Sequence, residues 1–191
     1  MARVLVPLAE GFEELEAVTI IDLLRRADIE VDVAGLAPGP VTGSRRTVIQ
    51  PDLTLDEALA RDYDMVVLPG GLPGATHLDQ DPRIHALLKR LHEGGKYTAA
   101  ICAAPRVLAH AGLLEGRHAT AYPGVLEADA GGARVSGEAV VRDGTVITSR
   151  GPGTAMDFAL ALIEALAGRG ARDQVEAGLQ RPGADHPGAA A

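Results

Sequence analysis

The only cysteine of the chain, Cys102, stands where a predicted strand meets a predicted helix. The segment Ala99-Ala100-Ile101-Cys102-Ala103-Ala104-Pro105 passes from an apolar run, through small residues, to a proline. This pattern is typical of a nucleophile elbow, in which a strained turn presents one reactive side chain. A thiol there also lies at a helix N-terminus, where unpaired N–H groups favour the thiolate. We interpret Cys102 as a reactive cysteine, and the alternative is a small buried hydrophobic residue.

A glycine pair ends the strand that precedes this one in the sequence. The segment Leu68-Pro69-Gly70-Gly71 lets the backbone turn its N–H groups toward a ligand, as an oxyanion-binding site requires. The backbone N–H of Ala103 would supply a second donor. A glycine pair after a strand is also a common turn. This segment therefore indicates an oxyanion-binding site only if it lies beside Cys102.

A carboxyl group for proton transfer could come from Glu13-Glu14-Leu15-Glu16, which follows the first predicted strand. Periodicity does not discriminate among the three glutamates, because each has apolar residues four and seven positions further on. Their ordinary role would be as solvated residues of a first helical turn, favoured by the helix dipole. A buried glutamate would instead have a raised pKa and could donate a proton to a thiolate.

The elements that must position these groups alternate between strands and helices. We predict strands over 4–8, 29–36, 63–68 and 97–101, and helices over 13–27, 81–93 and 105–111. Such alternation predicts a mainly parallel sheet covered by helices on both faces, with ligands at the carboxyl ends of the strands. Cys102, the glycine pair and the glutamates all follow such strand ends.

Other segments show more local signals. We expect an antiparallel excursion over 41–49, a capping box at Thr54-Leu55-Asp56-Glu57, and a hairpin turned at Asp143-Gly144. Thr154 is expected to cap a last helix that ends near Ala167. We therefore predict a single domain over 1–168 and a flexible C-terminal tail over 169–191, which is rich in Gly, Ala and Pro.

Composition excludes several classes of function. The chain has 191 residues, of which 47% are hydrophobic, and a net charge of −8 without a basic block. This balance disfavours nucleic acids and anionic membranes as partners, and no apolar run approaches the roughly 20 residues of a membrane span. One cysteine cannot form an internal disulfide, and no clustered Cys or His residues suggest a metal site. We expect a cytoplasmic protein in a reducing compartment.

Four segments in order resemble the ThiJ/PfpI superfamily of class I glutamine amidotransferase-like proteins, in its YajL-like branch. They are Ala9-Glu10-Gly11-Phe12-Glu13-Glu14-Leu15-Glu16, Val67-Leu68-Pro69-Gly70-Gly71, Ala99-Ala100-Ile101-Cys102-Ala103-Ala104-Pro105 and Thr148-Ser149-Arg150-Gly151-Pro152-Gly153-Thr154. The similarity runs from about Ala2 to Gly168. The resemblance implies a flavodoxin-like three-layer α/β/α sandwich, a homodimer, and activity without a cofactor or metal.

The resemblance also assigns roles to individual residues. It implies that Cys102 is the nucleophile, that Glu16 is the acid hydrogen-bonded to it, and that Gly71 and Ala103 are the oxyanion donors. Arg45 matches a family arginine near the pocket.

The sequence departs from some relatives at two positions. Ala103 stands where the protease-like branch has a histidine directly after the cysteine, and Tyr122 stands where some relatives have a histidine lining the pocket. The six histidines are scattered over predicted helices, loops and the tail. A Cys-His-acid triad is therefore not expected, and peptidase and glutaminase functions lose their general base.

The resemblance implies a cysteine-dependent enzyme for small reactive carbonyl compounds, of the glyoxalase III or deglycase type, which would convert methylglyoxal to lactate without glutathione. A thioester-forming hydrolase of an activated acyl metabolite would use the same groups. The rival class is an oxidative-stress sensor or redox-regulated chaperone. In that case Cys102 would be oxidised to a sulfinate held by Glu16, with no second cysteine to resolve it.

Overall fold

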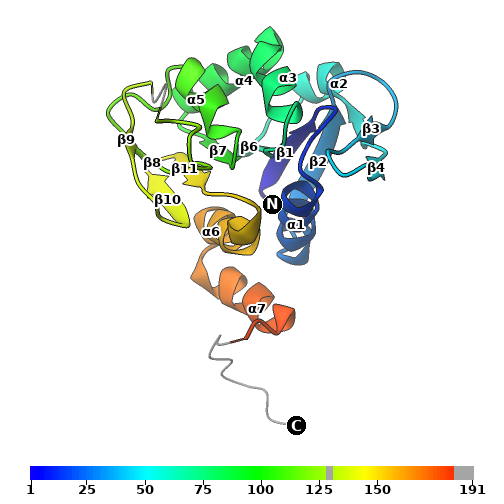
Figure 1. The fold of residues 1–191 in the computed structure, drawn as a ribbon. Helices are drawn as coiled ribbons and strands as arrows, with labels where there is room; N and C mark the ends of the chain where they lie inside the picture. The colour runs from blue at the N-terminus through cyan, green and yellow to red at the C-terminus, as the bar shows by residue number, and fades with distance from the viewer. Residues whose placement is uncertain (128–130, 183–191) are drawn as a thin grey trace.

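The computed structural model describes residues 1–127 and 131–182 of the chain. Within them, seven strands form the central sheet in the order β10-β11-β7-β6-β1-β2-β5 (Figure 1). β10 pairs antiparallel with β11, and every other pair in this sheet is parallel. The strands are β1 (Arg3–Leu8), β2 (Glu30–Gly35), β5 (Leu53–Thr54), β6 (Met65–Leu68), β7 (Tyr97–Ile101), β10 (Val140–Asp143) and β11 (Val146–Ser149).

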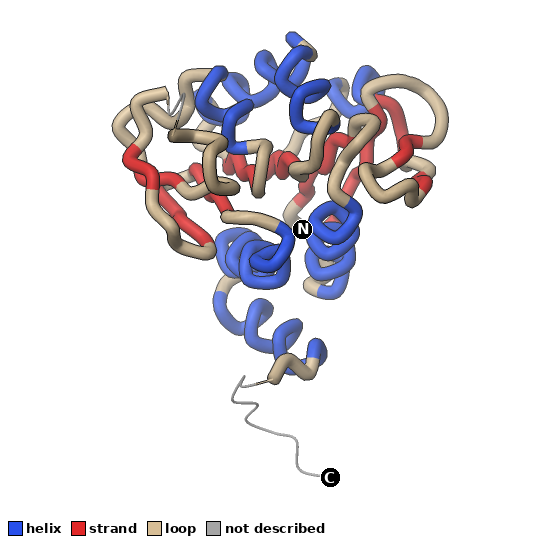
Figure 2. The backbone as a smooth tube through the Cα atoms, in the orientation of Figure 1, coloured by secondary structure: helices blue, strands red, loops and turns tan. Residues whose placement is uncertain are grey.

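Helices cover both faces of this sheet, which gives the three layers predicted from the sequence (Figure 2). One face carries α1 (Glu14–Arg26) and α6 (Ala155–Ala167), with α7 (Arg169–Leu179) packed below α6. The other face carries α2 (Leu55–Leu59), α3 (Gly74–Gln80), α4 (Pro82–Glu93) and α5 (Pro105–His110). The fold is the flavodoxin-like α/β sandwich.

The strands alternate their side chains between these two layers. In β1, Val4 and Val6 pack with α1 and α6, whereas Leu5 packs with the helices on the opposite face. All three side chains are fully buried. The apolar run that predicted a strand buried on both faces therefore builds the centre of the sheet.

Two short two-stranded sheets lie outside the central sheet, and a hairpin forms one edge of the central sheet. β3 (Val41–Thr42) and β4 (Val48–Ile49) form the predicted antiparallel excursion, and β10 with β11 forms the predicted hairpin. β8 (His118–Ala119) overlaps a short strand that the sequence predicts over 119–121, and it pairs with β9 (Arg134–Val135). The first of these pairs lies beside the N-terminal end of α1 (Figure 1).

Helix ends follow the sequence signals, with one exception. Thr54 and Glu57 form the predicted capping box of α2, in which the Thr54 N–H donates to Glu57 Oε2 at 2.7 Å. Asp81 caps α4 through the Arg83 N–H at 2.9 Å. Thr154 was expected to cap α6, but its hydroxyl donates to the Gly151 carbonyl at 2.9 Å and caps nothing in α6.

The predicted flexible tail is wrong for its first part, because α7 occupies Arg169–Leu179. Val175 is buried against α6, and Arg181 beyond the helix pairs with Asp157 of α6 at 2.8 Å. Apolar contact and ion pairs therefore hold a segment whose composition suggested disorder. The rest of that prediction, residues 183–191, lies outside the described part of the chain. No helix within the described ranges has the length and apolar character of a bilayer span.

Candidate active site

Cys102 occupies a sharp turn between β7 and α5 with a φ of +63°, a conformation that few residues other than glycine adopt. Its N–H donates to the Ser149 carbonyl at 3.0 Å, and its carbonyl accepts the Tyr122 N–H at 2.9 Å. Neighbouring backbone on both sides thus fixes the strained residue. The elbow geometry that the sequence predicted is present, and 9% of Cys102 remains exposed.

Glu16 is fully buried in the first turn of α1, on the same helix face as Ala17 and Ile20. Its Oε2 accepts the Gly70 N–H at 2.8 Å. Within the described residues, its Oε1 is buried without a nitrogen or oxygen partner, and the Cys102 thiol lies within hydrogen-bonding reach of this carboxyl. The structure therefore places a buried carboxyl group directly beside the sulfur.

The other two glutamates of this segment point elsewhere. The Ser44 hydroxyl donates to Glu13 Oε2 at 3.2 Å and to Glu14 Oε2 at 3.1 Å, and the Arg45 N–H donates to Glu14 Oε1 at 2.6 Å. Glu13 and Glu14 thus anchor the β3–β4 loop. The ambiguity that periodicity left among the three glutamates is resolved by geometry in favour of Glu16.

Burial raises the pKa of both members of the Glu16–Cys102 pair. Glu16 rises from 4.5 to about 7, mainly through desolvation, although the hydrogen bond from Gly70 opposes this change. The pKa of Cys102 rises from 9.0 to about 12, through desolvation and then through the negative charge of Glu16. The pair behaves as one titrating unit that holds a single proton above neutral pH.

The raised pKa of Cys102 contradicts the expectation that helix N–H groups and a protonated acidic neighbour keep this sulfur ionised at neutral pH. The thiol is favoured while Glu16 is a carboxylate, because two adjacent buried negative charges repel each other. A thiolate forms when the shared proton moves to Glu16, which removes that repulsion. Because the pKa of Cys102 lies well above that of Glu16, the shared proton rests mainly on the sulfur, and the thiolate is the minor form of the pair.

Backbone N–H groups of Gly71 and Ala103 hydrogen-bond the Cys102 sulfur and lower its pKa, against the effect of burial. Gly71 has a φ of +92°, and a Cβ there would collide with the Glu13 nitrogen and the Gly11 carbonyl. Glycine is therefore required at this position. The two donors expected from the sequence thus converge beside one sulfur, close to where a carbonyl oxygen would become negatively charged when that sulfur attacks its carbon.

Gly70 also helps to build the site, although the sequence indicated only the glycine pair and gave Gly70 no role of its own. Its carbonyl accepts the Glu13 N–H at 2.9 Å while its own N–H holds Glu16, so it ties the glycine loop to the start of α1 in both directions. The glycine pair was the available signal, but only the sheet order reveals which glycine faces the acid.

We expect Gly70→Ala to disrupt this site. The added Cβ would lie 2.7 Å from Cys102 Cβ, 2.7 Å from Glu16 Oε2 and 2.9 Å from the Ile101 carbonyl, in a region without space to relax. Overpacking of this kind costs about 1–3 kcal/mol. Denaturant unfolding should show that loss, with Gly153→Ala as the control, where a Cβ meets nothing within 4 Å and φ, as at Gly70, lies outside the left-handed region. Equal losses in both variants would contradict this account.

Tyr122 and Arg45 differ in whether they contact the Glu16–Cys102 pair. Tyr122 is joined to Cys102 through its backbone, is 51% exposed, and packs its ring near Gly151. Arg45 is exposed on the β3–β4 loop, and its guanidinium donates to the Ser44 carbonyl at 3.4 Å. It has no hydrogen bond or ion pair with Glu16 or Cys102 within the described residues. The structure therefore joins Tyr122, but not the Arg45 side chain, to the central pair.

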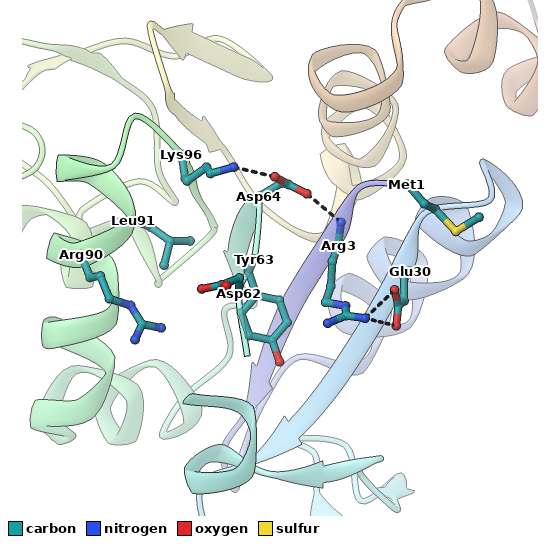
Figure 3. A pocket seen from close by; sticks show the side chains of 9 residues that line it. All are labelled: Met1, Arg3, Glu30, Asp62, Tyr63, Asp64, Arg90, Leu91 and Lys96. Carbon is teal, nitrogen blue, oxygen red and sulfur yellow. Dashed lines mark hydrogen bonds and ion pairs between the residues drawn. The ribbon is translucent and has the colours of Figure 1, made fainter. Parts of the chain in front are cut away.

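A polar cavity of about 530 Å³ lies at the other edge of the sheet, at the N-terminal ends of the strands (Figure 3). Arg3 pairs with Glu30 at 2.8 Å, and Asp64 accepts from both the Lys96 ammonium at 2.7 Å and the Arg3 N–H at 3.0 Å. Because its charges largely neutralise one another, this cavity offers no activated group. Within residues 1–127 and 131–182, no three His, Cys, Asp or Glu side chains are placed to hold a metal ion.

Comparison with known proteins decides the family. The model of the DJ-1/PfpI family matches residues 2–165 of this chain. The chain belongs to the DJ-1/PfpI family. The family resemblance expected from the four motifs is thus confirmed, and the match covers all of the site groups described above.

Several relatives are similar over most of this family member. The Parkinson disease protein 7 homolog of Danio rerio is 46% identical over 182 residues, which cover 93% of this chain and 96% of that protein. The crystal structure of Drosophila melanogaster DJ-1beta superposes with a TM-score of 0.90 at 43% identity, covering 93% and 97% of the two chains. The glutathione-independent glyoxalase DJR-1.2 of Caenorhabditis elegans is 36% identical, over 87% of this chain and 89% of that one. The match spans only 40% of protein DJ-1 homolog B of Arabidopsis thaliana, at 43% identity.

Proposed function

We propose that this protein is a glutathione-independent glyoxalase that converts methylglyoxal to lactate through a covalent adduct on Cys102. The observation that carries the proposal is a buried acid–thiol pair with two N–H donors at the sulfur. The name of the Caenorhabditis elegans relative supports the same class of reaction. The related removal of early glycation adducts from proteins would use the same atoms.

The proposed reaction needs no external oxidant or reductant. The Cys102 thiolate adds to the aldehyde carbon, and the oxygen of that carbonyl takes the proton held by Glu16, which gives a hemithioacetal. The Glu16 carboxylate then removes the hydrogen from the same carbon to give an enediol, whose two oxygens share the hydroxyl proton. Return of a proton to the neighbouring carbon, with the hydroxyl proton now on that carbon's oxygen, leaves a lactoyl thioester. Water hydrolyses the thioester, so that lactate leaves and the sulfur is regenerated.

Each group of the site has a role in these reaction steps. Gly71 and Ala103 stabilise the oxyanion that forms on addition and again on hydrolysis. Glu16 serves first as acid and then as base, a dual role that a pKa near 7 suits. Tyr122 borders the site where a histidine stands in some relatives, and we propose that its ring limits the size of the substrate.

The test is lactate formation by the purified chain from methylglyoxal, without glutathione, beside parallel assays with glyoxal and with an acyl thioester. Conversion of the two dicarbonyl compounds supports the proposal. Turnover of the acyl thioester alone would replace it with the thioester-forming hydrolase, which shares the nucleophile and the oxyanion donors.

A redox sensor or redox-regulated chaperone remains a second candidate, because the buried Glu16 Oε1 could donate a short hydrogen bond to a sulfinate on Cys102. Peroxide treatment followed by intact mass measurement separates the two classes. Addition of two oxygens at low peroxide, in a protein without carbonyl turnover, would favour the sensor. Turnover without such oxidation would favour the enzyme.

We further propose that the chain forms a homodimer through the exposed face of α1 and the neighbouring β3–β4 pair. Leu15, Val18 and Val48 are large apolar side chains that are 53%, 47% and 60% exposed there. Val18 and Ile49 also line an adjacent hollow of about 280 Å³. Apolar surface gathered in this way is typical of a contact surface.

Val18→Asp should shift the protein from dimer to monomer, because the added carboxylate would lose its hydration at the contact. Light scattering at several concentrations measures the shift, with Met156→Asp as the control for an exposed apolar residue on α6. A wild-type monomer at all concentrations would contradict the proposal.

A further inference from the structure

The two N–H donors at the Cys102 sulfur are each followed by a short helix. The loop that carries Gly71 leads into α3, and the turn that carries Ala103 leads into α5. Both helices lie on the same face of the sheet (Figure 1). Because a helix is a stiff rod, the relative placement of α3 and α5 sets the relative placement of the two donors.

Side chains bridge these two helices well away from the sulfur. His110, the last residue of α5, places its Nδ1 2.7 Å from Oδ2 of Asp79 near the end of α3. A carboxylate only accepts, so the Nδ1 atom carries the hydrogen. Nearer the site, Arg106 donates from Nη2 to the Thr76 hydroxyl at 3.2 Å. α3 and α5 are thus tied both in their first turns and at their far ends.

Asp79 also joins α4 to this arrangement. His85 on α4 places its Nε2 2.7 Å from the main-chain carbonyl of Asp79, and 3.3 Å from Asp79 Oδ1. The Asp79 side chain is 15% exposed, so water screens its contacts only partly. One residue therefore meets groups from two other helices, although the sequence suggested only scattered surface histidines.

We propose that Asp79 is a positioning residue, which holds α3 against α5 and thereby keeps the Gly71 and Ala103 N–H groups aimed at the reacting atoms. The inference rests on the proposed function, since the two donors matter only if Cys102 reacts. α3 has seven residues and is about 10 Å long, so a small tilt at its far end displaces the glycine loop. A misplacement of about 1 Å at a reacting centre can cost about a hundredfold in rate.

The test combines turnover of methylglyoxal with a pH titration of the Cys102 thiolate by its ultraviolet absorbance. We expect Asp79→Ala to lower kcat about tenfold and to change KM by less than about twofold, because the donors act on the transition state. The thiolate midpoint should rise by about half a pH unit as the sulfur loses part of its N–H bonding. Mere destabilisation would move this midpoint the other way, because an unfolded chain has a thiol of ordinary pKa, below the raised value of the folded site.

Matched variants test whether the hydrogen bond between Asp79 and His110 causes these effects. Asp79→Asn keeps an oxygen that accepts from His110, and it should retain at least about half of the wild-type kcat. Glu93→Ala removes an exposed carboxylate from the end of α4 and should change neither readout. If Asp79→Ala does not fold, His110→Ala should produce the same rise in the midpoint.

Several outcomes would overturn the proposal. An unchanged midpoint and kcat in folded Asp79→Ala would do so, as would equal losses in Asp79→Ala and Asp79→Asn. If the wild-type protein has no carbonyl turnover, the proposed function fails, yet the midpoint shift still tests whether Asp79 positions the donors.

Discussion

Replacement of the nucleophile, Cys102→Ser, should lower lactate formation from methylglyoxal by at least about a thousandfold. A serine hydroxyl has no appreciable anion near neutral pH, and it is a much weaker nucleophile than a thiolate. The measurement is kcat/KM with purified protein in the absence of glutathione. Serine is close in size to cysteine, so the fold around the elbow should be kept.

The control for this loss is thermal unfolding of the variant and of wild type. Transitions within a few degrees of each other would show that the chemistry, and not the fold, has been removed. Turnover in Cys102→Ser within tenfold of wild type would exclude a covalent role for the sulfur and would move the search for a nucleophile elsewhere.

The second large effect concerns Glu16→Gln, which should lower kcat about a hundredfold while making the protein more stable at alkaline pH. Glutamine keeps an oxygen for the Gly70 N–H but can neither give nor take the proton, and general acid–base catalysis contributes about 10²- to 10⁴-fold. Loss of turnover together with a gain in stability is the signature of a functional residue held at a cost to the fold.

The gain in stability should depend on pH. In the folded chain the pKa of Glu16 is about 7, whereas its ordinary value is 4.5, so the folded state holds this proton more tightly than the unfolded state. The contribution of Glu16 to wild-type stability therefore falls as pH rises from about 4.5 to 7 and is constant above that. Because glutamine does not ionise, the variant should lead wild type by up to about 3 kcal/mol at pH 8.

Urea unfolding of both proteins at pH 4 and pH 8 measures this difference. Glu14→Gln is the matched control, because Glu14 lies in the same helical turn but hydrogen bonds from the loop hold its pKa below the ordinary value. The stability advantage of Glu16→Gln should be small at pH 4 and large at pH 8. An advantage that is the same at both pH values would contradict a buried, ionising Glu16.

Local signals were sufficient for the elbow and for much of the sheet. A strand, small residues and a proline around Cys102 leave few other backbone paths, and the capping signals at Thr54 and Asp81 placed the starts of α2 and α4. The choice of Glu16 was different. It came from family resemblance, because the first turn of α1 offers three glutamates, and only the packing of that helix against Gly70 buries one of them.

Features that depend on distant contacts were not predictable from local sequence. α3 contains Thr76 and His77 and follows Pro73, so it lacks the apolar period of a helix, and its bridges to α5 become visible only in three dimensions. α7 resembles a tail in composition but docks on α6. The raised pKa of Cys102 has the same origin, because the sequence reveals the helix N-terminus but not the burial.

The central claim is that Glu16 and Cys102 share one proton, and the pH dependence of Cys102 alkylation by iodoacetamide tests it most directly. In wild type, the alkylation rate should rise with a midpoint near pH 7, as the first proton leaves the pair, and should then reach a plateau. In Glu16→Gln, the step near pH 7 should be absent. Coincident curves for the two proteins, both rising without a plateau toward the ordinary thiol range, would contradict the account.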